Sequence, residues 1–136
     1  MKFFFDNNLP PALAHAIKAL CDRDPDIADV VHLRDRFPGD TKDLVWIPAL
    51  VNEVGPWYVL SIDKFKKDHR AEREAIRRAG LTVYVLDSQW SGQSYWSKAA
   101  RIVLWWPTVS KHASLSAGGV YRVPWRFTNQ SRLQAC

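Results

Sequence analysis

Short continuous apolar runs and longer stretches with helical spacing alternate along the 136-residue chain. Apolar runs of four to six residues, bounded by turn residues, are typical of strands that are buried on both faces. The expected strands cover residues 2–5, 30–33, 57–62 and 81–86, with a further short strand at 119–125. The tail beyond it is expected to be loose.

Between these runs, apolar residues recur three and four positions apart, which is the spacing of one helix face. The expected helices cover residues 9–21, 41–54, 69–79 and 91–106, and residues 22–29 and 34–42 are expected to be loops. Pro107 is expected to end the last helix. The inward face of that helix is predicted to carry Trp96, Ala99, Ala100, Val103 and Leu104.

Strands and helices in alternation favour an α/β fold, in which helices flank a parallel sheet and the crossovers are right-handed. The length fits one domain spanning residues 1–136. Its core is expected at about residues 2–107, followed by a C-terminal extension at about 108–136.

Composition and charge restrict the functional class of the protein only slightly. The net charge of +5 suits a polyanionic partner such as nucleic acid, and equally suits plain solubility. Cys21 and Cys136 form no zinc-binding motif and no disulfide framework. The apolar run before Asp6 is too short for a signal peptide, and no stretch is apolar enough to span a membrane. A cytoplasmic protein is the expectation.

Aspartates follow three of the expected strands, at Asp6, Asp63 and Asp87, and Asp43 opens the helix before the third strand. If the first and third strands are neighbours, Asp6 and Asp63 project into one crevice. Clustered carboxylates repel one another, and Mg²⁺ or Mn²⁺ would compensate their charge. Taken singly, each acid is also an ordinary turn former, N-cap or helix-dipole partner, and for Asp87 a loop role is the preferred interpretation.

Five segments carry a resemblance to a known family, in the right order and spacing. They are FFFDNNLPP at 3–11, HLRDRF at 32–37, DLVWI at 43–47, WYVLSIDK at 57–64 and EREAIRRAGL at 72–81. Together they resemble PIN-like domains, and among these the toxins of bacterial toxin–antitoxin modules. The resemblance covers residues 2–86.

The resemblance implies a three-layer α/β/α sandwich with a mainly parallel central sheet, and RNA cleavage that depends on Mg²⁺ or Mn²⁺. It assigns both catalysis and metal binding to Asp6, Asp43 and Asp63. Ser61, Asn8 and Glu72 would support the site, although Glu72 also fits a solvated helix face.

Two features depart from the family pattern. Many relatives carry an acid where this chain has Asn7, and a further acid after the second strand has no clean match here. Asp35 or Asp40 would fill that place, or no residue does. His32 is assigned a packing or surface role.

Basic residues flank the expected crevice and are candidates for holding phosphates. A solvated surface cluster is the ordinary alternative. The candidates are Lys64, Lys66, Lys67, Arg70, Arg34 and Arg36.

The leading hypothesis is therefore a metal-dependent endoribonuclease acting as the toxin of a toxin–antitoxin pair. Its expected partners are an RNA substrate, a cognate antitoxin protein and a second copy in a homodimer. The alternative is an inactive RNA- or protein-binding module on the same fold. A receiver-type phosphoacceptor domain is a third reading, and it is disfavoured because Asn7 and Asn8 replace the paired acids that it needs.

Overall fold

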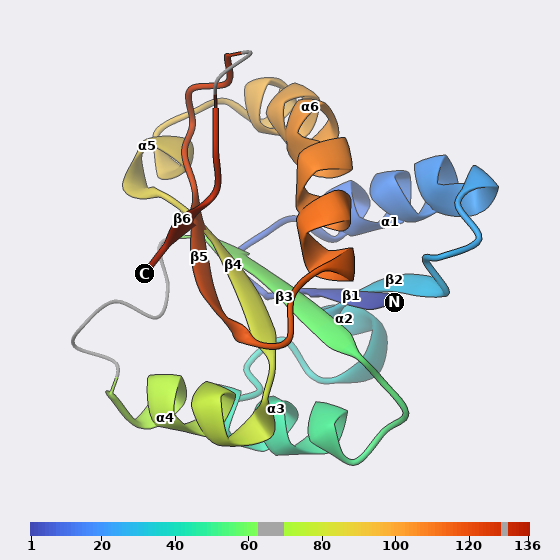
Figure 1. The fold of residues 1–136 in the computed structure, drawn as a ribbon, viewed down its shortest axis with the longest axis vertical. Coiled ribbons are helices and arrows are strands. Elements are labelled where there is room, and N and C mark those ends of the chain that lie inside the picture. Colours follow the sequence, from blue (N-terminus) through green and yellow to red (C-terminus); the bar gives the residue numbers. More distant parts are fainter. Residues whose placement is uncertain (63–69, 129–130) are drawn as a thin grey trace.

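The computed structural model describes residues 1–62, 70–128 and 131–136, and they form a mainly parallel sheet between two helix layers (Figure 1). The strand order is β2-β1-β3-β4-β5-β6, and only the pairing of β5 with β6 is antiparallel. The strands are β1 (Lys2–Phe5), β2 (Asp29–His32), β3 (Trp57–Ile62), β4 (Thr82–Leu86), β5 (Gly119–Val123) and β6 (Gln134–Ala135).

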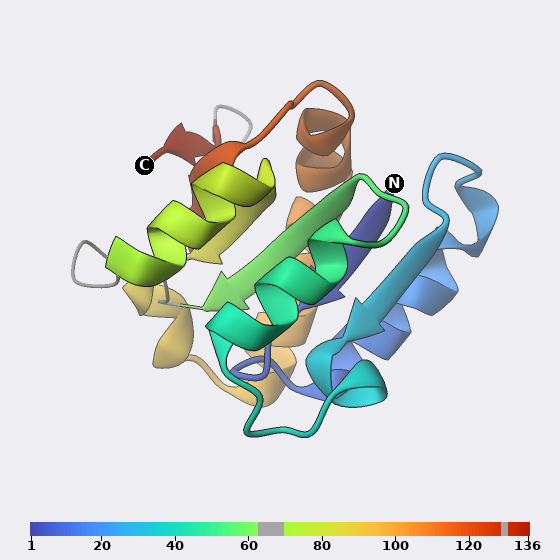
Figure 2. The same ribbon diagram turned by 90° about the horizontal axis from the view of Figure 1, so that it is seen from below.

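The helices cover both faces of the sheet, which confirms the predicted α/β/α sandwich. Figure 2 shows α3 and α4 on the face toward the viewer, with α1 and α6 on the opposite face. The α-helices are α1 (Pro11–Leu20), α2 (Leu33–Arg36), α3 (Asp43–Val51), α4 (Arg70–Ala79), α5 (Ser88–Ser91) and α6 (Tyr95–Ser114), and a 3₁₀ turn covers Cys21–Arg23.

The two faces of the central strand β1 explain why the sheet needs both helix layers. Phe3 and Phe5 are fully buried in the cluster that includes residues of α1 and α6. Phe4 points to the other face, where its ring stacks on Trp46 of α3 with centroids 4.7 Å apart. A strand buried on both sides reads as a continuous apolar run, which is why the sequence predicted it.

Residues 33–36 form the short helix α2, so the prediction of a loop over 34–42 was wrong at its start. A capping box explains the helix. The Nδ1 atom of His32 accepts a hydrogen bond from the N–H of Arg34, and the carboxylate of Asp35 accepts one from the N–H of His32. Histidine is an unusual N-cap residue, so the usual Ser/Thr signal was missing from the sequence.

The last helix continues through Pro107 to Ser114, so the prediction that proline ends it was wrong. A proline inside a helix removes one backbone hydrogen bond. Beyond Pro107, Val109 and Ala113 are buried against the core, and this packing offsets the loss.

The predicted inward face of this helix was also wrong. Trp96, Val103 and Leu104 are exposed instead of buried, and so is Ala100. Of the five predicted residues, Ala99 does pack against the core. Because both sides of the helix are apolar, spacing alone could not tell which side faces the sheet. The buried residues of α6 are Ile102, Trp105, Trp106, Val109 and Ala113.

The C-terminal segment adds two strands to the sheet. The strand expected near 119–125 is confirmed as β5, which pairs in parallel with β4. The tail is not loose at its end, because β6 pairs with Tyr121 and Arg122. Between β5 and β6, the ring of Trp125 packs edge-on against Trp90 at 4.9 Å.

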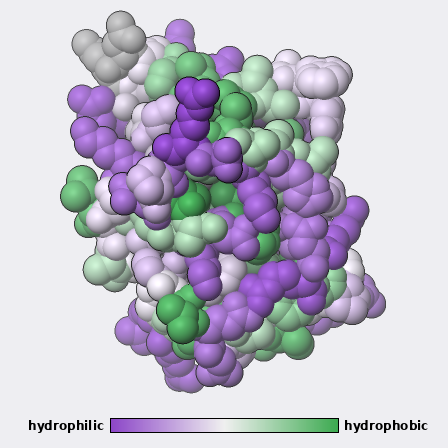
Figure 3. All heavy atoms as spheres, turned by 90° about the vertical axis from the view of Figure 1, so that its right-hand side faces the viewer, coloured by the Kyte–Doolittle hydropathy of each residue, from purple (hydrophilic) through white to green (hydrophobic). Residues whose placement is uncertain are grey.

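The surface around α1 and β2 is that of an ordinary solvated face. Figure 3 views the molecule from this side, and hydrophilic residues cover most of it, with scattered hydrophobic ones. Over the described ranges, no helix has both the length and the apolar character needed to cross a bilayer.

Candidate metal and nucleic-acid site

Asp6 follows β1 directly and is fully buried. Its N–H donates to the carbonyl of Leu60 at 2.9 Å, which extends the pairing of β1 with β3 by one residue. Its Oδ1 accepts a hydrogen bond from the N–H of Asn7 at 2.6 Å, and its Oδ2 accepts one from the hydroxyl of Ser61 at 3.2 Å. The expected adjacency of the first and third strands is confirmed, and it places a buried carboxylate at the carboxyl edge of the sheet.

Asn8 ties the loop after β1 to the end of β3. Its Nδ2 donates to the carbonyl of Ile62 at 2.7 Å and lies 3.4 Å from the hydroxyl oxygen of Ser61. Its Oδ1 accepts from the N–H of Ile62 at 3.3 Å. The backbone that leads into residue 63 is therefore fixed beside Asp6.

Several of the candidate residues cannot be placed relative to Asp6. Asp63, Lys64, Lys66 and Lys67 lie outside the described residues, and of Arg70 only the backbone, at the start of α4, is described. Within the described ranges, no three His, Cys, Asp or Glu side chains gather closely enough to hold a metal ion.

Asp43 is the first residue of α3, where the helix dipole stabilises a negative charge. Its Oδ1 accepts a hydrogen bond from the indole N–H of Trp46 at 3.0 Å. Trp46 is fully buried and stacks on Phe4, two residues before Asp6. The core thus fixes the orientation of Asp43. Glu72 lies in the first turn of α4, which packs beside α3 (Figure 2).

Asn7 links three segments beside Asp6. Its Nδ2 donates to the carbonyl of Gly39 at 2.7 Å, and its Oδ1 accepts from the Nε–H of Arg34 at 2.7 Å. An amide can donate to one partner and accept from the other, whereas a carboxylate has no donor. The asparagine therefore has a structural reason to stand where many relatives have an acid.

The two arginines of α2 differ in their surroundings. The Nε of Arg34 lies at Asn7, next to the Asp6 loop. Arg36 pairs with Glu53 and lies over the ring of Trp57, 5.3 Å from the centroid. Trp57 begins β3, at the end of that strand opposite Asp6.

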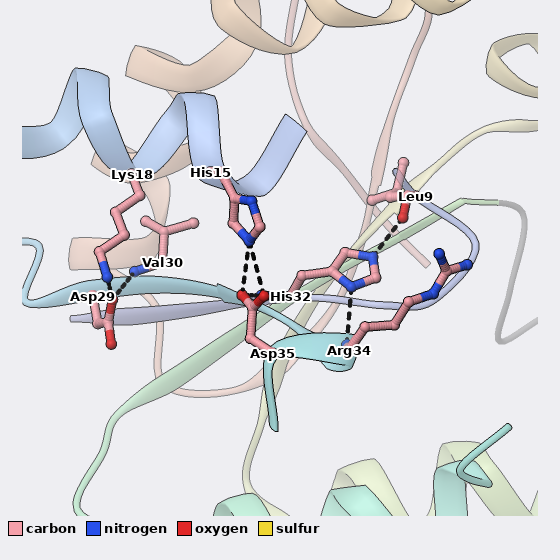
Figure 4. A network of polar contacts seen from close by, with 8 residues as sticks. All are labelled: Leu9, His15, Lys18, Asp29, Val30, His32, Arg34 and Asp35. Carbon is pink, nitrogen blue, oxygen red and sulfur yellow. Dashed lines mark hydrogen bonds and ion pairs between the residues drawn. The ribbon is translucent and has the colours of Figure 1, made fainter. Parts of the chain in front are cut away.

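Asp35 connects the start of α2 to β2 and α1. Its Oδ2 accepts from the N–H of His32 at 2.8 Å, and its carboxylate contacts the Nε2 of His15 at 2.9 Å (Figure 4). Partial burial alone would raise the pKa of Asp35, but these hydrogen bonds outweigh it and lower the pKa. Asp40 lies in an exposed turn.

His32 is a fully buried residue whose two ring nitrogens are both engaged, and it holds β2 against the loop after β1. Its Nε2 lies 2.5 Å from the carbonyl of Leu9, and its Nδ1 lies 3.0 Å from the N–H of Arg34 (Figure 4). The carbonyl requires a donor and the N–H requires an acceptor, so the ring is neutral with its proton on Nε2. Burial is the main cause that lowers the pKa of His32.

We expect the free energy of unfolding to fall as the pH is lowered from 7 through 6.5, the ordinary pKa of histidine. The unfolded chain takes up a proton there, whereas folded His32, with its lowered pKa, does not. Urea unfolding at a series of pH values should show a smaller fall for His32→Gln than for wild type. His112 also has a lowered pKa and leaves a residual slope.

The exposed His15 supplies the control for this measurement. His15→Gln should keep the dependence that His32 causes, because His32 and its partners Leu9 and Arg34 are unchanged. An identical pH dependence in wild type and His32→Gln would contradict the assignment of a buried neutral imidazole.

A parallel sheet between two helix layers, with a buried carboxylate where its central strands end, defines an α/β protein whose functional groups gather at the carboxyl edge. A family model described as "PIN like domain" matches residues 1–88. The chain belongs to this PIN-like domain family, as its sequence resemblance predicted. No curated protein and no solved structure gives a significant match to the chain.

The role of Asn7 gives a second prediction. Asn7→Asp should lower the free energy of unfolding by about 1 kcal/mol, because a carboxylate would face the carbonyl of Gly39 without a donor. The substitution should not raise metal affinity or nuclease activity, even though it restores an acid. Urea unfolding and a cleavage assay on the same preparation check both statements.

Asn7→Ser is the matched comparison, since a hydroxyl carries both a donor and an acceptor and no charge. A marked gain in cleavage by Asn7→Asp would show that position 7 is a lost ligand and would contradict this account.

Proposed function

We propose that the protein is a metal-dependent endoribonuclease in which Asp6, Asp43 and Asp63 hold Mg²⁺ or Mn²⁺. The single observation that carries the proposal is the buried carboxylate of Asp6, fixed by Asn7 and Ser61 at the carboxyl end of the central strand. A carboxylate is costly to bury, and a cation bound beside it offsets that cost.

The donor atoms near Asp6 fit a hard cation. They are the oxygens of a carboxylate, a hydroxyl and a side-chain amide, from Asp6, Ser61 and Asn8. Mg²⁺ and Mn²⁺ prefer such oxygen ligands, whereas Zn²⁺ is more often held by imidazole or thiolate. His32 uses both ring nitrogens for backbone contacts, so it offers no ligand to the site.

When bound, the metal ion would make a water molecule more acidic and offset the negative charge of the phosphodiester. The chain itself supplies orientation. The hydroxyl of Ser61 and the N–H of Asn7 each fix one oxygen of Asp6, and Asn8 fixes the end of β3. Arg34 uses its Nε for Asn7, which leaves its terminal N–H groups to bind a phosphate oxygen.

The biological role that we propose is that of the toxin in a toxin–antitoxin pair. Its partners would be an RNA substrate, a cognate antitoxin protein and a second copy of the chain. The support is the resemblance of the five sequence segments to PIN-like toxins. A basic net charge of +5 is consistent with an RNA substrate.

A second candidate is a non-catalytic RNA-binding module on the same fold. Asn7 favours it, because many relatives have an acid at this position, and this chain therefore has one negative charge fewer to offset the charge of a bound metal ion. The two candidates differ in one respect, which is whether RNA is cut when metal is present.

We expect the purified chain to cleave single-stranded RNA with Mg²⁺ or Mn²⁺, and to lose this activity with EDTA. Activity should return when Mn²⁺ is added in excess over the chelator. Gel analysis of a labelled RNA measures both steps. RNA that is bound but left intact with either metal would support the second candidate and contradict the nuclease.

A further inference from the structure

Helix α6 has two apolar faces, and the described residues of the chain cover only one of them. The inner face packs into the core through Trp105, Trp106 and neighbouring residues. On the outer face, Trp96 is 78% exposed, Val103 45% and Leu104 48%. This outer face, here called the α6 stripe, consists of Trp96, Ala100, Val103, Leu104 and Pro107, all of which are exposed.

The α6 stripe is continuous at helical spacing. At 3.6 residues per turn its five positions fall within an arc of about 100°, and they extend over about 16 Å of helix. Single exposed apolar residues are ordinary on a protein surface. A continuous stripe opposite a buried face is instead typical of a helix that is covered on both sides.

The C-terminal segment that contains the stripe carries charge of one sign. Residues 88–136 contain six Lys or Arg and no Asp or Glu, whereas residues 1–87 contain 13 basic and 14 acidic residues. The net positive charge of the protein therefore comes from the C-terminal segment. Within α6 the charged residues are Lys98, Arg101 and Lys111.

One of these cations is already anchored next to the helix. Arg101 donates to the carbonyl of Trp125 at 3.1 Å, and its guanidinium lies 4.4 Å from the centroid of the Trp125 ring. It holds a positive charge at a fixed place beside the apolar surface. Lys111 is exposed and continues the line of the stripe toward the end of α6.

We propose that the α6 stripe is the docking surface for an acidic amphipathic helix of a partner protein. The apolar positions of that helix would pack on Trp96, Val103 and Leu104, and its flanking Glu or Asp residues would lie near the cations of α6. The proposal is independent of the nuclease, because it involves none of the groups around Asp6.

The same observations argue against two other occupants. A second copy would bring its own Arg101 and Lys111 against these two without any acid in either helix. Single-stranded RNA requires stacking rings, and on the α6 stripe only Trp96 provides one, because the other four residues are aliphatic.

The test uses the full chain and three synthetic helical peptides with identical apolar residues, flanked by Glu, Gln or Lys. Fluorescence anisotropy of the labelled peptides should show saturable binding of the Glu peptide. Binding should be about tenfold weaker for the Gln peptide, absent for the Lys peptide, and weakened by salt.

Leu104→Glu should weaken binding of the Glu peptide by about tenfold or more, because it places within the stripe a negative charge that repels the glutamates of the peptide. The matched control is Leu44→Glu on α3, a leucine that is 51% exposed on the opposite side of the sheet. It should bind as wild type does, and circular dichroism should show that both variants are folded.

Any result of the following three kinds would overturn the proposal. The first is equal binding of the three peptides, or no binding of the Glu peptide. The second is unchanged binding by Leu104→Glu. The third is another occupant of the stripe, seen either as a dimer in sedimentation that Leu104→Glu dissociates, or as single-stranded RNA that displaces the Glu peptide.

Discussion

Asp6→Asn is expected to reduce RNA cleavage by about 100-fold or more, while the protein stays folded. The amide has the size of the carboxylate, and it still accepts from the N–H of Asn7 and still reaches the hydroxyl of Ser61. It lacks the negative charge that a divalent ion needs. Cleavage rates in Mn²⁺, together with thermal unfolding of the same sample, separate the loss of activity from a loss of structure.

Asp87→Asn is the matched control, because Asp87 also follows a strand of the same sheet. Its Oδ1 accepts from the N–H of Gln89 at 3.0 Å and caps α5. Asparagine caps a helix as well as aspartate does. This variant should cleave RNA like wild type. Equal activity of Asp6→Asn and Asp87→Asn would show that Asp6 is not part of the catalytic site.

Trp46→Ala is expected to cost about 3–5 kcal/mol of the free energy of unfolding. Its indole is fully buried between α3 and the sheet, where it stacks on Phe4. The substitution leaves a large cavity and removes the hydrogen bond to Asp43. Urea unfolding followed by circular dichroism measures the loss.

Trp96→Ala is the same substitution at an exposed position of α6, and it should change the free energy of unfolding by about 0.5 kcal/mol or less. A small effect at Trp46, or equal effects at the two sites, would contradict the described packing of α3 on the sheet.

The sheet could be predicted from sequence because its central strands are buried on both faces. Phe3–Phe5 and residues 57–62 are continuous apolar runs that a helix face or an exposed strand would interrupt. Asp6 could be found as a candidate for the same reason, since it is the first polar residue after such a run. The neighbour relation of β1 and β3 then brought Ser61 to it.

Other features depend on contacts between distant segments, which no local pattern reveals. The amide of Asn7 joins Arg34 and Gly39, and the ring of His32 joins Leu9 and Arg34. From the sequence, Asn7 was a missing acid and His32 a residue with a packing or surface role. Only the folded chain shows that both hold the loops around Asp6.

The face of α6 that packs on the sheet could not be predicted either, because the helix has two apolar faces and only one of them can pack into the core. In the structure, Trp105 and Trp106 are buried, and Val103 and Leu104 lie at the surface. The failed prediction of the inward face and the proposed docking surface thus have one physical cause.

Calorimetric titration of Mn²⁺ into the full chain tests the central claim, that the Asp6 carboxylate forms part of a divalent-metal site. We predict saturable binding to wild type and Asp87→Asn, and no detectable binding to folded Asp6→Asn. Binding of equal affinity to wild type and Asp6→Asn, or no binding to wild type, would contradict the account.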